Sequence, residues 1–188
     1  MKGMPKGVRV KPRSRTEIRE AAEFILKACD VVELPVPIIE ILEFKLSEMG
    51  IVYDYAAKSD LGVEEGRTYP DRDYVRIREG VYIGAVSERG RDRFTIAHEL
   101  GHLVLHWGIP LSRMEQPPPL TFYESSEWQA EVFASELLMP VQQIRQSCGD
   151  ANDIMYLANV SYRAAEVQWE VLKKEGLLDA EKTTRTGV

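Results

Sequence analysis

The strongest constraint on this chain is a helical segment that is apolar on nearly every side and yet holds all three of its histidines. From about residue 93 to residue 106, apolar side chains recur on almost every face of a helical pattern, which predicts a buried helix. The histidines stand at positions 98, 102 and 106. Residues four apart share one face of a helix, so His98 and His102 project side by side, as two ligands of one metal ion must.

An acidic residue next to this pair indicates hydrolytic chemistry. Glu99 follows His98 directly and points about 100° around the helix, so its carboxylate could reach a water on the metal rather than the metal itself. That is the position of a general base. The pattern His-Glu-x-x-His also occurs on surface helices, where its side chains are simply solvated. Here an unpartnered buried carboxylate would cost several kcal/mol, which favours the metal site.

A catalytic zinc ion usually has three protein ligands and one open position, so a third ligand must come from elsewhere in the chain. The extended metzincin pattern is excluded, because its required Gly and His are replaced by Leu105 and Gly108. His106 lies two turns, about 12 Å, beyond the first histidine, and we expect it to be a core or supporting residue. The spacing leaves both Glu127 and Glu131 as candidates for the third ligand.

Capping signals, periodicity and turn residues predict the other elements. We expect helices at 14–29, 37–50, 126–138, 153–159 and 163–175, and strands at 51–55, 74–78 and 81–86. Ser14-x-x-Glu17 and Ser126-x-x-Gln129 are interpreted as capping signals. Glu79-Gly80 separates the last two strands and is typical of a hairpin turn, so the small sheet is predicted to be antiparallel.

The charge of the chain is unevenly distributed. Its 188 residues carry 24 bases and 30 acids, and the six bases of residues 1–15 leave only 18 bases for the acidic remainder. An acidic body argues against broad binding to a nucleic-acid backbone. We predict a basic flexible arm at 1–13, a single domain over 14–178 and a disordered tail at 179–188.

Membrane insertion and a disulfide framework are not expected. No stretch approaches the roughly 18 uninterrupted apolar residues of a membrane span, and the basic start has no apolar region after it. We therefore expect a cytoplasmic protein with no membrane contact. Cys29 and Cys148 lie far apart in the sequence and fit neither a disulfide framework nor a Cys-x-x-Cys pair.

Two sequence blocks resemble the signature of the ImmA/IrrE family of metallo-endopeptidases. The first is RFTIAHELGH at residues 93–102, followed by His106, and the second is Glu127-x-x-Ala130-x-x-Phe133-Ala134-x-x-Leu137-Leu138-Met139-Pro140. The resemblance spans residues 15 to 176. It implies a zincin-like α+β fold, with a small antiparallel sheet packed on the buried HExxH helix and additional N- and C-terminal helices. It also implies a zinc-dependent endopeptidase that acts on a protein substrate.

The resemblance assigns roles to individual residues. It makes His98, His102 and Glu127 the ligands of one zinc ion per chain and Glu99 the catalytic acid and base. Glu131 stands where the family usually has Asn, and we expect it to orient a ligand histidine. The strand nearest the cleft pairs with an extended peptide in such folds, and residues 81–86 are the predicted strand. Helix-turn-helix repressors in the cytosol are the substrates that the family suggests.

The main alternative is a regulatory or DNA-binding protein that binds a metal without turnover. Residues 153–175 can be interpreted as a helix-turn-helix-like pair. The second helix of that pair mixes three glutamates with three bases and has no basic face, and the intact Glu99 favours an enzyme. The donor that would stabilise an oxyanion stays open among four residues: Tyr123, Tyr156, Tyr162 and Arg163.

Overall fold

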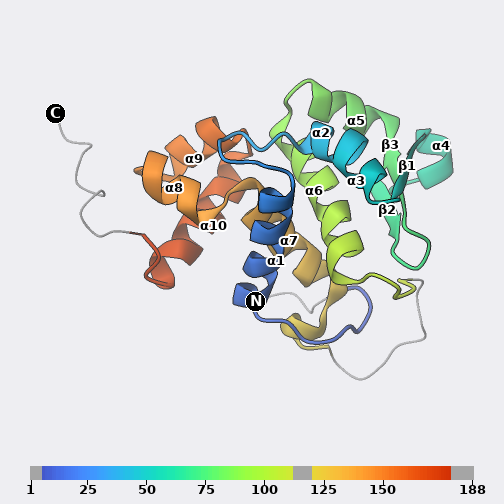
Figure 1. Cartoon of the computed structure of the whole chain (residues 1–188), viewed down its shortest axis with the longest axis horizontal. Coiled ribbons are helices and arrows are strands. Elements are labelled where there is room, and N and C mark those ends of the chain that lie inside the picture. The colour runs from blue at the N-terminus through green and yellow to red at the C-terminus, as the bar shows by residue number, and fades with distance from the viewer. Residues whose placement is uncertain (1–5, 112–119, 179–188) are drawn as a thin grey trace.

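The computed structural model of the chain describes residues 6–111 and 120–178 and confirms the α+β class (Figure 1). The elements of the first half are α1 (Arg15–Ala28), α2 (Ile38–Glu40), the π-helical turn η1 (Ile41–Lys45), α3 (Leu46–Glu48), β1 (Val52–Ala56), α4 (Lys58–Leu61), β2 (Gly66–Tyr69), β3 (Tyr74–Arg78), α5 (Glu79–Val86) and α6 (Gly90–Leu105). The second half has the 3-10 turn η2 (Phe122–Glu124), α7 (Ser126–Leu138), α8 (Val141–Ser147), α9 (Ala151–Ala158) and α10 (Tyr162–Lys174).

The centre of the fold is formed by α6 and α7, with α1 packed against α7. Figure 1 shows the sheet and α4 on one side of these helices and α8, α9 and α10 on the other. A glycine allows the central pair to approach closely. A Cβ atom on Gly101 of α6 would lie 3.0 Å from the Cα atom of Ala130 on α7. The two sequence blocks that resemble the family signature are therefore packed on each other.

The sheet has the strand order β1-β3-β2, and it is mixed rather than antiparallel. β1 pairs with β3 in parallel, with Val52 opposite Tyr74, whereas β2 and β3 are antiparallel, with Gly66 opposite Ile77. The predicted antiparallel sheet is therefore wrong for the first pair. β2 was not predicted at all. It lies at one edge of the sheet and packs against α6.

The predicted strand at 81–86 is wrong, because these residues belong to α5 (Glu79–Val86). A short run that is apolar throughout does not distinguish a strand from a buried helix by its periodicity. The buried positions Val81, Gly84 and Ala85 have the i, i+3, i+4 spacing of a helix face. Arg78 is extended and the helix begins directly after it, so no hairpin forms at Glu79. Residues 81–86 cannot serve as the edge strand for a peptide.

Residues 6–13 pack against the start of α7 instead of forming the expected flexible arm. The backbone N–H of Val10 donates to the carbonyl of Glu124 at 2.9 Å, and Val10 is buried. The N–H of Val8 donates to Oγ of Ser126 at 3.0 Å. The arm was predicted from its charge alone, which does not reveal such backbone pairing. Its first five residues and the predicted tail at 179–188 lie outside the described residues.

The predicted caps agree with the structure at α1 and differ at α7. Ser14 and Glu17 form the expected capping box of α1. At α7 the N-cap is Ser125, whose Oγ accepts from the N–H of Trp128 at 3.1 Å, and Ser126 is the first helical residue. The predicted helices at 153–159 and 163–175 correspond to α9 and α10, each of which begins slightly earlier than predicted.

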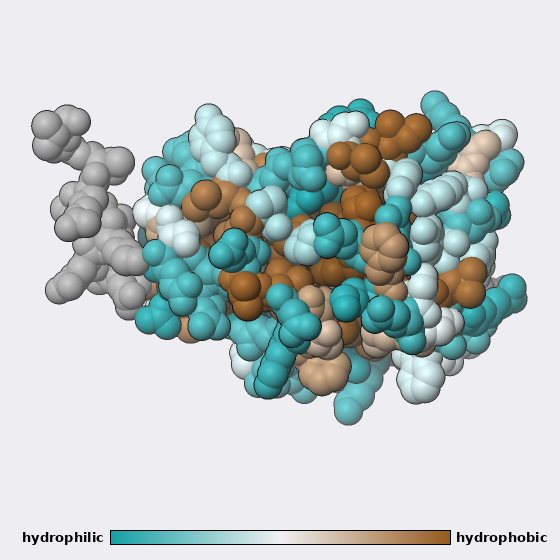
Figure 2. Space-filling model, turned by 45° about the horizontal axis from the view of Figure 1, so that its top comes forward, coloured by the Kyte–Doolittle hydropathy of each residue, from teal (hydrophilic) through white to brown (hydrophobic). Residues whose placement is uncertain are grey.

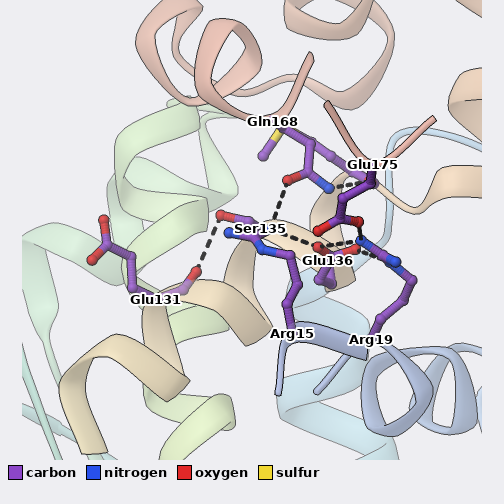
Figure 3. Close-up of polar contacts among 8 residues, drawn as sticks. Arg15, Arg19, Glu131, Ser135, Glu136, Gln168 and Glu175 are labelled. Carbon is purple, nitrogen blue, oxygen red and sulfur yellow. Dashed lines mark hydrogen bonds and ion pairs between the residues drawn. The ribbon is translucent and has the colours of Figure 1, made fainter. Parts of the chain in front are cut away.

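A buried ion cluster joins α1, α7 and α10 (Figure 3). The side chain of Glu136 on α7 is fully buried and accepts from Arg15 at 2.7 Å and from Arg19 at 2.8 Å. Arg19 also pairs with Glu175 at 2.7 Å, just beyond the end of α10. Gln168 of α10 completes the cluster through a hydrogen bond with Arg15. A buried carboxylate is stable only with such partners, so the cluster fixes how the three helices meet.

No helix in the described part of the chain is long and apolar enough to cross a membrane. On the face shown in Figure 2, hydrophobic side chains form a broken band between mostly hydrophilic ends. The exposed hydrophobic residues of the described chain come from several elements, among them α1, α5 and α10 (Phe24, Ile83, Val86 and Val167). They do not mark a single element as a binding face.

Candidate metal centre

Three side chains from α6 and α7 bring their ligand atoms together. The Nε2 atoms of His98 and His102 lie 3.1 Å apart. The carboxylate of Glu127 lies 3.4 Å from Nε2 of His98 and 3.5 Å from Nε2 of His102. Among residues 6–111 and 120–178, this is the one group of three or more histidine, cysteine or acidic side chains with such spacing. Of the candidates that spacing left open, Glu127 is therefore the residue that joins the two histidines.

The donor set fits a zinc ion. Tetrahedral ligands at about 2.05 Å from zinc lie about 3.3 Å apart, close to the separations found here. Two imidazole nitrogens and one carboxylate also leave a fourth position for a water or a substrate. Local structure explains the arrangement, since the Ser125 cap places Glu127 in the first turn of α7. Helix packing at Gly101 then brings that turn against the two histidines.

The carboxylate of Glu127 and the two histidines interact electrostatically, and these interactions shift the pKa values of Glu127 and His98. Hydrogen bonds with His102 and His98 hold the pKa of Glu127 far below its ordinary value, although burial acts in the opposite direction. Burial would lower the pKa of His98, but the carboxylates of Glu127 and Glu99 outweigh it and raise that pKa. A carboxylate that stays ionised next to imidazole nitrogens is the electrostatic environment that a cation requires.

Glu99 is held by the edge strand β2 rather than by α6 alone. Its side chain is buried, and Oε2 accepts a hydrogen bond from the hydroxyl of Thr68 at 2.6 Å. A Cβ atom on Gly66 would lie 2.7 Å from Cγ of Glu99, so a glycine is needed where the strand passes this carboxylate. Burial raises the pKa of Glu99, against the neighbouring histidines and Thr68, which lower it. A raised pKa suits a group that accepts and returns a proton near neutral pH.

His106 lies behind the ligands and is fully buried, in agreement with the predicted supporting role. Its Nδ1 atom lies 3.2 Å from Nδ1 of His102, and its Nε2 atom lies 3.2 Å from Oε1 of Gln129. Burial and the charge of His102 lower the pKa of His106 to about 4. Glu131, which we expected to orient a ligand histidine, is exposed instead. The ring nitrogen of His102 that faces away from Glu127 contacts His106 and not Glu131.

A cavity of about 720 Å³ opens over the three ligands and Glu99. β2 forms one wall with Arg67 and Tyr69 among its polar side chains, and Arg72 lines the cavity from the turn that follows β2. The four residues that the sequence left open as oxyanion donors are not among the described residues that line this cavity. An extended segment could lie along β2 with its backbone facing Glu99 and the ligands.

Sequence reasoning missed the residues that support the site. Gly66 and Thr68 lie in a strand of only four residues, which is too short to show an alternating pattern. Gln129 was interpreted as part of a capping signal, whereas its side chain contacts His106. One available signal was position, because Gln129 follows Glu127 by two residues within the second block. A buried polar residue inside an apolar helix pattern is itself a reason to look for a partner.

The chain is similar to a known protein family and to a solved structure. The family model described as the IrrE N-terminal-like domain, a peptidase family, matches residues 38–170, which is more than half of the chain. A search of curated proteins gave no match. Among solved structures, a Mycobacterium tuberculosis transcriptional regulator is similar, with a TM-score of 0.51 and 16% sequence identity. The similarity covers 80% of this chain and 45% of that structure, and at this identity it supports the fold alone.

Proposed function

This chain belongs to the ImmA/IrrE family, whose model describes an IrrE N-terminal-like peptidase domain, and on that premise we propose that it is a zinc-dependent endopeptidase. The family membership indicates a metallopeptidase, and the proposal adds the metal and the type of cleavage. One observation carries it. Two imidazoles and a carboxylate converge within 4.8 Å of one another, and the buried carboxylate of Glu99 faces the same cavity.

The proposed mechanism assigns one task to each group. A bound zinc ion would supply Lewis acidity toward a water and toward the scissile carbonyl. His98, His102 and Glu127 would hold it. Glu99 accepts a proton from the attacking water while the oxygen of that water bonds to the scissile carbonyl carbon. Glu99 then delivers the proton to the leaving amine as the C–N bond breaks. Thr68 keeps the carboxylate of Glu99 in place through both transfers.

The proposed substrate is an extended segment of a protein. β2 has one partner within the described sheet, so its other edge can pair with a peptide backbone. This assigns to β2 the role that was expected of residues 81–86. The cavity is lined by both acidic and basic side chains, including Glu64 and Arg72, and so does not select for one charge. Helix-turn-helix repressors remain our candidate substrates, on the basis of the family resemblance.

DNA binding by α9 and α10 is less well supported than peptide hydrolysis. Two of the three bases of α10 are paired within the helix, since Arg163 pairs with Glu166 at 2.6 Å and Lys173 with Glu170 at 3.1 Å. Phosphate contacts need free cations on one face. Titration with a labelled duplex at two salt concentrations separates the two functions, because a DNA-binding protein would show tight, salt-dependent binding.

The test of the proposed function is zinc-dependent cleavage that disappears in Glu99→Gln. Zinc-loaded wild type and Glu99→Gln protein are incubated with a proteome-derived peptide library, and new termini are identified by mass spectrometry. We expect new termini only with wild type, while both proteins hold the same zinc. A trapping experiment with Glu99→Gln in cell extract then identifies the protein substrate. Equal cleavage by both proteins, or none by the zinc-loaded wild type, would overturn the proposal.

A further inference from the structure

A chain of buried side chains leads from the metal centre to the N-terminal segment. His102 contacts His106, His106 contacts Gln129, and Gln129 contacts the backbone of Lys11 and Tyr123. We infer that Gln129 and His106 are positioning residues that fix the tautomer of His102 and direct its Nε2 lone pair toward the metal. The inference rests on the proposed zinc site and deepens it.

The first step fixes the amide of Gln129. Its Nε2 atom lies 2.9 Å from the carbonyl oxygen of Lys11 and 2.7 Å from that of Tyr123. Carbonyl oxygens only accept hydrogen bonds, so the NH₂ group of the amide must face them and donate both of its hydrogens. The amide oxygen Oε1 therefore points the other way, toward His106, and can only accept.

The second step fixes both histidine rings. Nε2 of His106 lies 3.2 Å from Oε1 of Gln129, an acceptor, and so must carry the hydrogen. A neutral ring then has a bare Nδ1, which accepts from Nδ1–H of His102 at 3.2 Å. With its hydrogen on Nδ1, His102 presents a lone pair on Nε2. That atom is the one beside His98 and Glu127.

Burial makes this order of donors and acceptors obligatory. His106 and Gln129 are both fully buried, so water cannot replace a mismatched partner. Reversing the amide would oppose its oxygen to the carbonyls of Lys11 and Tyr123. Reversing the tautomer of His106 would set two hydrogens against each other at the contact with His102. Each reversal leaves buried polar groups unpaired, and this is costly.

The connection also gives the N-terminal segment a part in the site. The carbonyl of Lys11 is one of the two acceptors that hold Gln129. Residues 6–13 are thus linked to a metal ligand through two side chains, although they are distant from α6 in the sequence. The same segment is fastened independently by Arg13, whose guanidinium donates to the carbonyl of Leu105 at 3.3 Å.

The direct test is NMR of the ring nitrogens in the protein with uniform ¹⁵N labelling. The chain has three histidines, so single substitutions assign every ring. In the zinc-loaded protein we expect His106 to carry hydrogen on Nε2 and none on Nδ1. We also expect a ¹⁵N–¹⁵N coupling across the hydrogen bond between the Nδ1 atoms of His102 and His106. A bare Nε2 on His106 overturns the inference.

Two substitutions of the same residue separate positioning from packing. His106→Asn places an amide oxygen near the former Nδ1 and keeps an acceptor for His102, whereas His106→Leu keeps the apolar volume and removes the acceptor. Both variants lose the hydrogen bond between residue 106 and Gln129, so the effect of that loss is the same in each and cancels when the two variants are compared. We expect zinc affinity, measured against a graded chelator, to fall ~10- to 100-fold in His106→Leu and distinctly less in His106→Asn. Equal losses, or a greater loss in His106→Asn, contradict the inference.

A variant of Gln129 provides a second measurement that does not depend on His106 substitutions. Gln129→Met keeps the volume of the side chain and removes its donors and its acceptor. We expect the His106 ring of the metal-free variant to lose the Nε2–H preference that it has in metal-free wild type, which NMR detects directly. An unchanged tautomer would refute the assigned role of Gln129. These readouts need no peptide hydrolysis, so a protein with the expected tautomers and no activity would refute the proposed function alone.

Discussion

The hydroxyl of Thr68 lies 2.6 Å from Oε2 of Glu99, so the edge strand of the sheet holds the proposed catalytic carboxylate. The same hydroxyl lies 3.1 Å from the backbone carbonyl of Glu99. Thr68 on β2 thus contacts both the backbone carbonyl and the side-chain carboxylate of Glu99, the proposed proton acceptor. Any peptide that pairs with β2 would be aligned with Glu99 by the same strand.

Replacing Thr68 with Val should lower turnover while zinc binding is retained. Val has nearly the same shape but no hydroxyl, so Glu99 loses its donor and its fixed orientation. We expect kcat to fall ~10- to 100-fold, the range typical of supporting residues. The measurement is peptide cleavage together with zinc content by elemental analysis. Thr68→Ser retains the hydroxyl and should lose far less, so equal defects in the two variants would exclude the hydrogen bond as the cause.

Replacing Gly66 with Ala should displace Glu99. The added Cβ would lie 2.7 Å from Cγ and 2.9 Å from Oε1 of that residue, closer than real contacts allow. We expect a severe loss of cleavage with intact zinc binding, because the three ligands are not touched. Gly80→Ala is the matched control, since a Cβ there meets nothing within 4 Å. If Gly66→Ala cleaves as fast as Gly80→Ala, the strand does not constrain Glu99.

Removing Glu127 should weaken zinc binding far more than removing Glu131. Both are glutamates of α7, one turn apart, but only Glu127 lies beside the two histidines, and Glu131 is exposed. We expect Glu127→Ala to lose more than ~100-fold in zinc affinity, beyond the range of supporting residues. Competition with a graded chelator measures both variants. A larger effect of Glu131→Ala would mean that the carboxylate ligand was assigned incorrectly.

Replacing Glu136 with Leu should destabilise the whole fold. The substitution leaves Arg15 and Arg19 without their shared buried partner, which costs about 3 kcal/mol in the free energy of unfolding. Denaturant unfolding measures the change. Glu170→Leu removes an exposed pair with Lys173 and should cost less than about 1 kcal/mol. Similar losses for both variants would show that burial of the cluster contributes little.

The stability of α9 should depend on pH through its N-cap. The backbone N–H groups of Asp153 and Asn152 donate to Asp150 and lower the pKa of its carboxyl below 3.8. A carboxyl group whose pKa is lower in the folded than in the unfolded protein stabilises the fold at pH values above its unfolded pKa. This stabilisation is lost as the pH falls through the folded-state pKa. Wild type should therefore lose stability relative to Asp150→Asn as acid is added below about pH 4. Parallel acid titrations of the two proteins, followed by circular dichroism, test this.

The central helix pair was predictable because its sequence pattern is long and specific. The helices predicted at about 93–106 and at 126–138 correspond to α6 (Gly90–Leu105) and α7 (Ser126–Leu138), and spacing alone placed His98 and His102 on one face. The spacing could not choose the third ligand, which depends on how α7 packs near Gly101. The α+β class and the family followed from the same two blocks.

The sheet and the supporting residues were harder to predict, for physical reasons. Residues 81–86 are apolar on every side, and only their packing on α6 decides that they are helical. β2 is too short to show a period, so Thr68 left no signal in the sequence. The partners of Gln129 are backbone carbonyls at Lys11 and Tyr123, which any residue could supply.

The open edge of β2 also bears on self-association. An unpaired strand edge can pair with the same strand of a second copy as readily as with a substrate. Here the strand is only four residues long and carries Arg67, which is bound to Glu64 at 2.6 Å. Short edge strands with charged side chains are poor templates for edge-to-edge pairing with a strand of a second copy. The edge that we propose for substrate binding is therefore built to be occupied briefly, by a peptide that is cut and released.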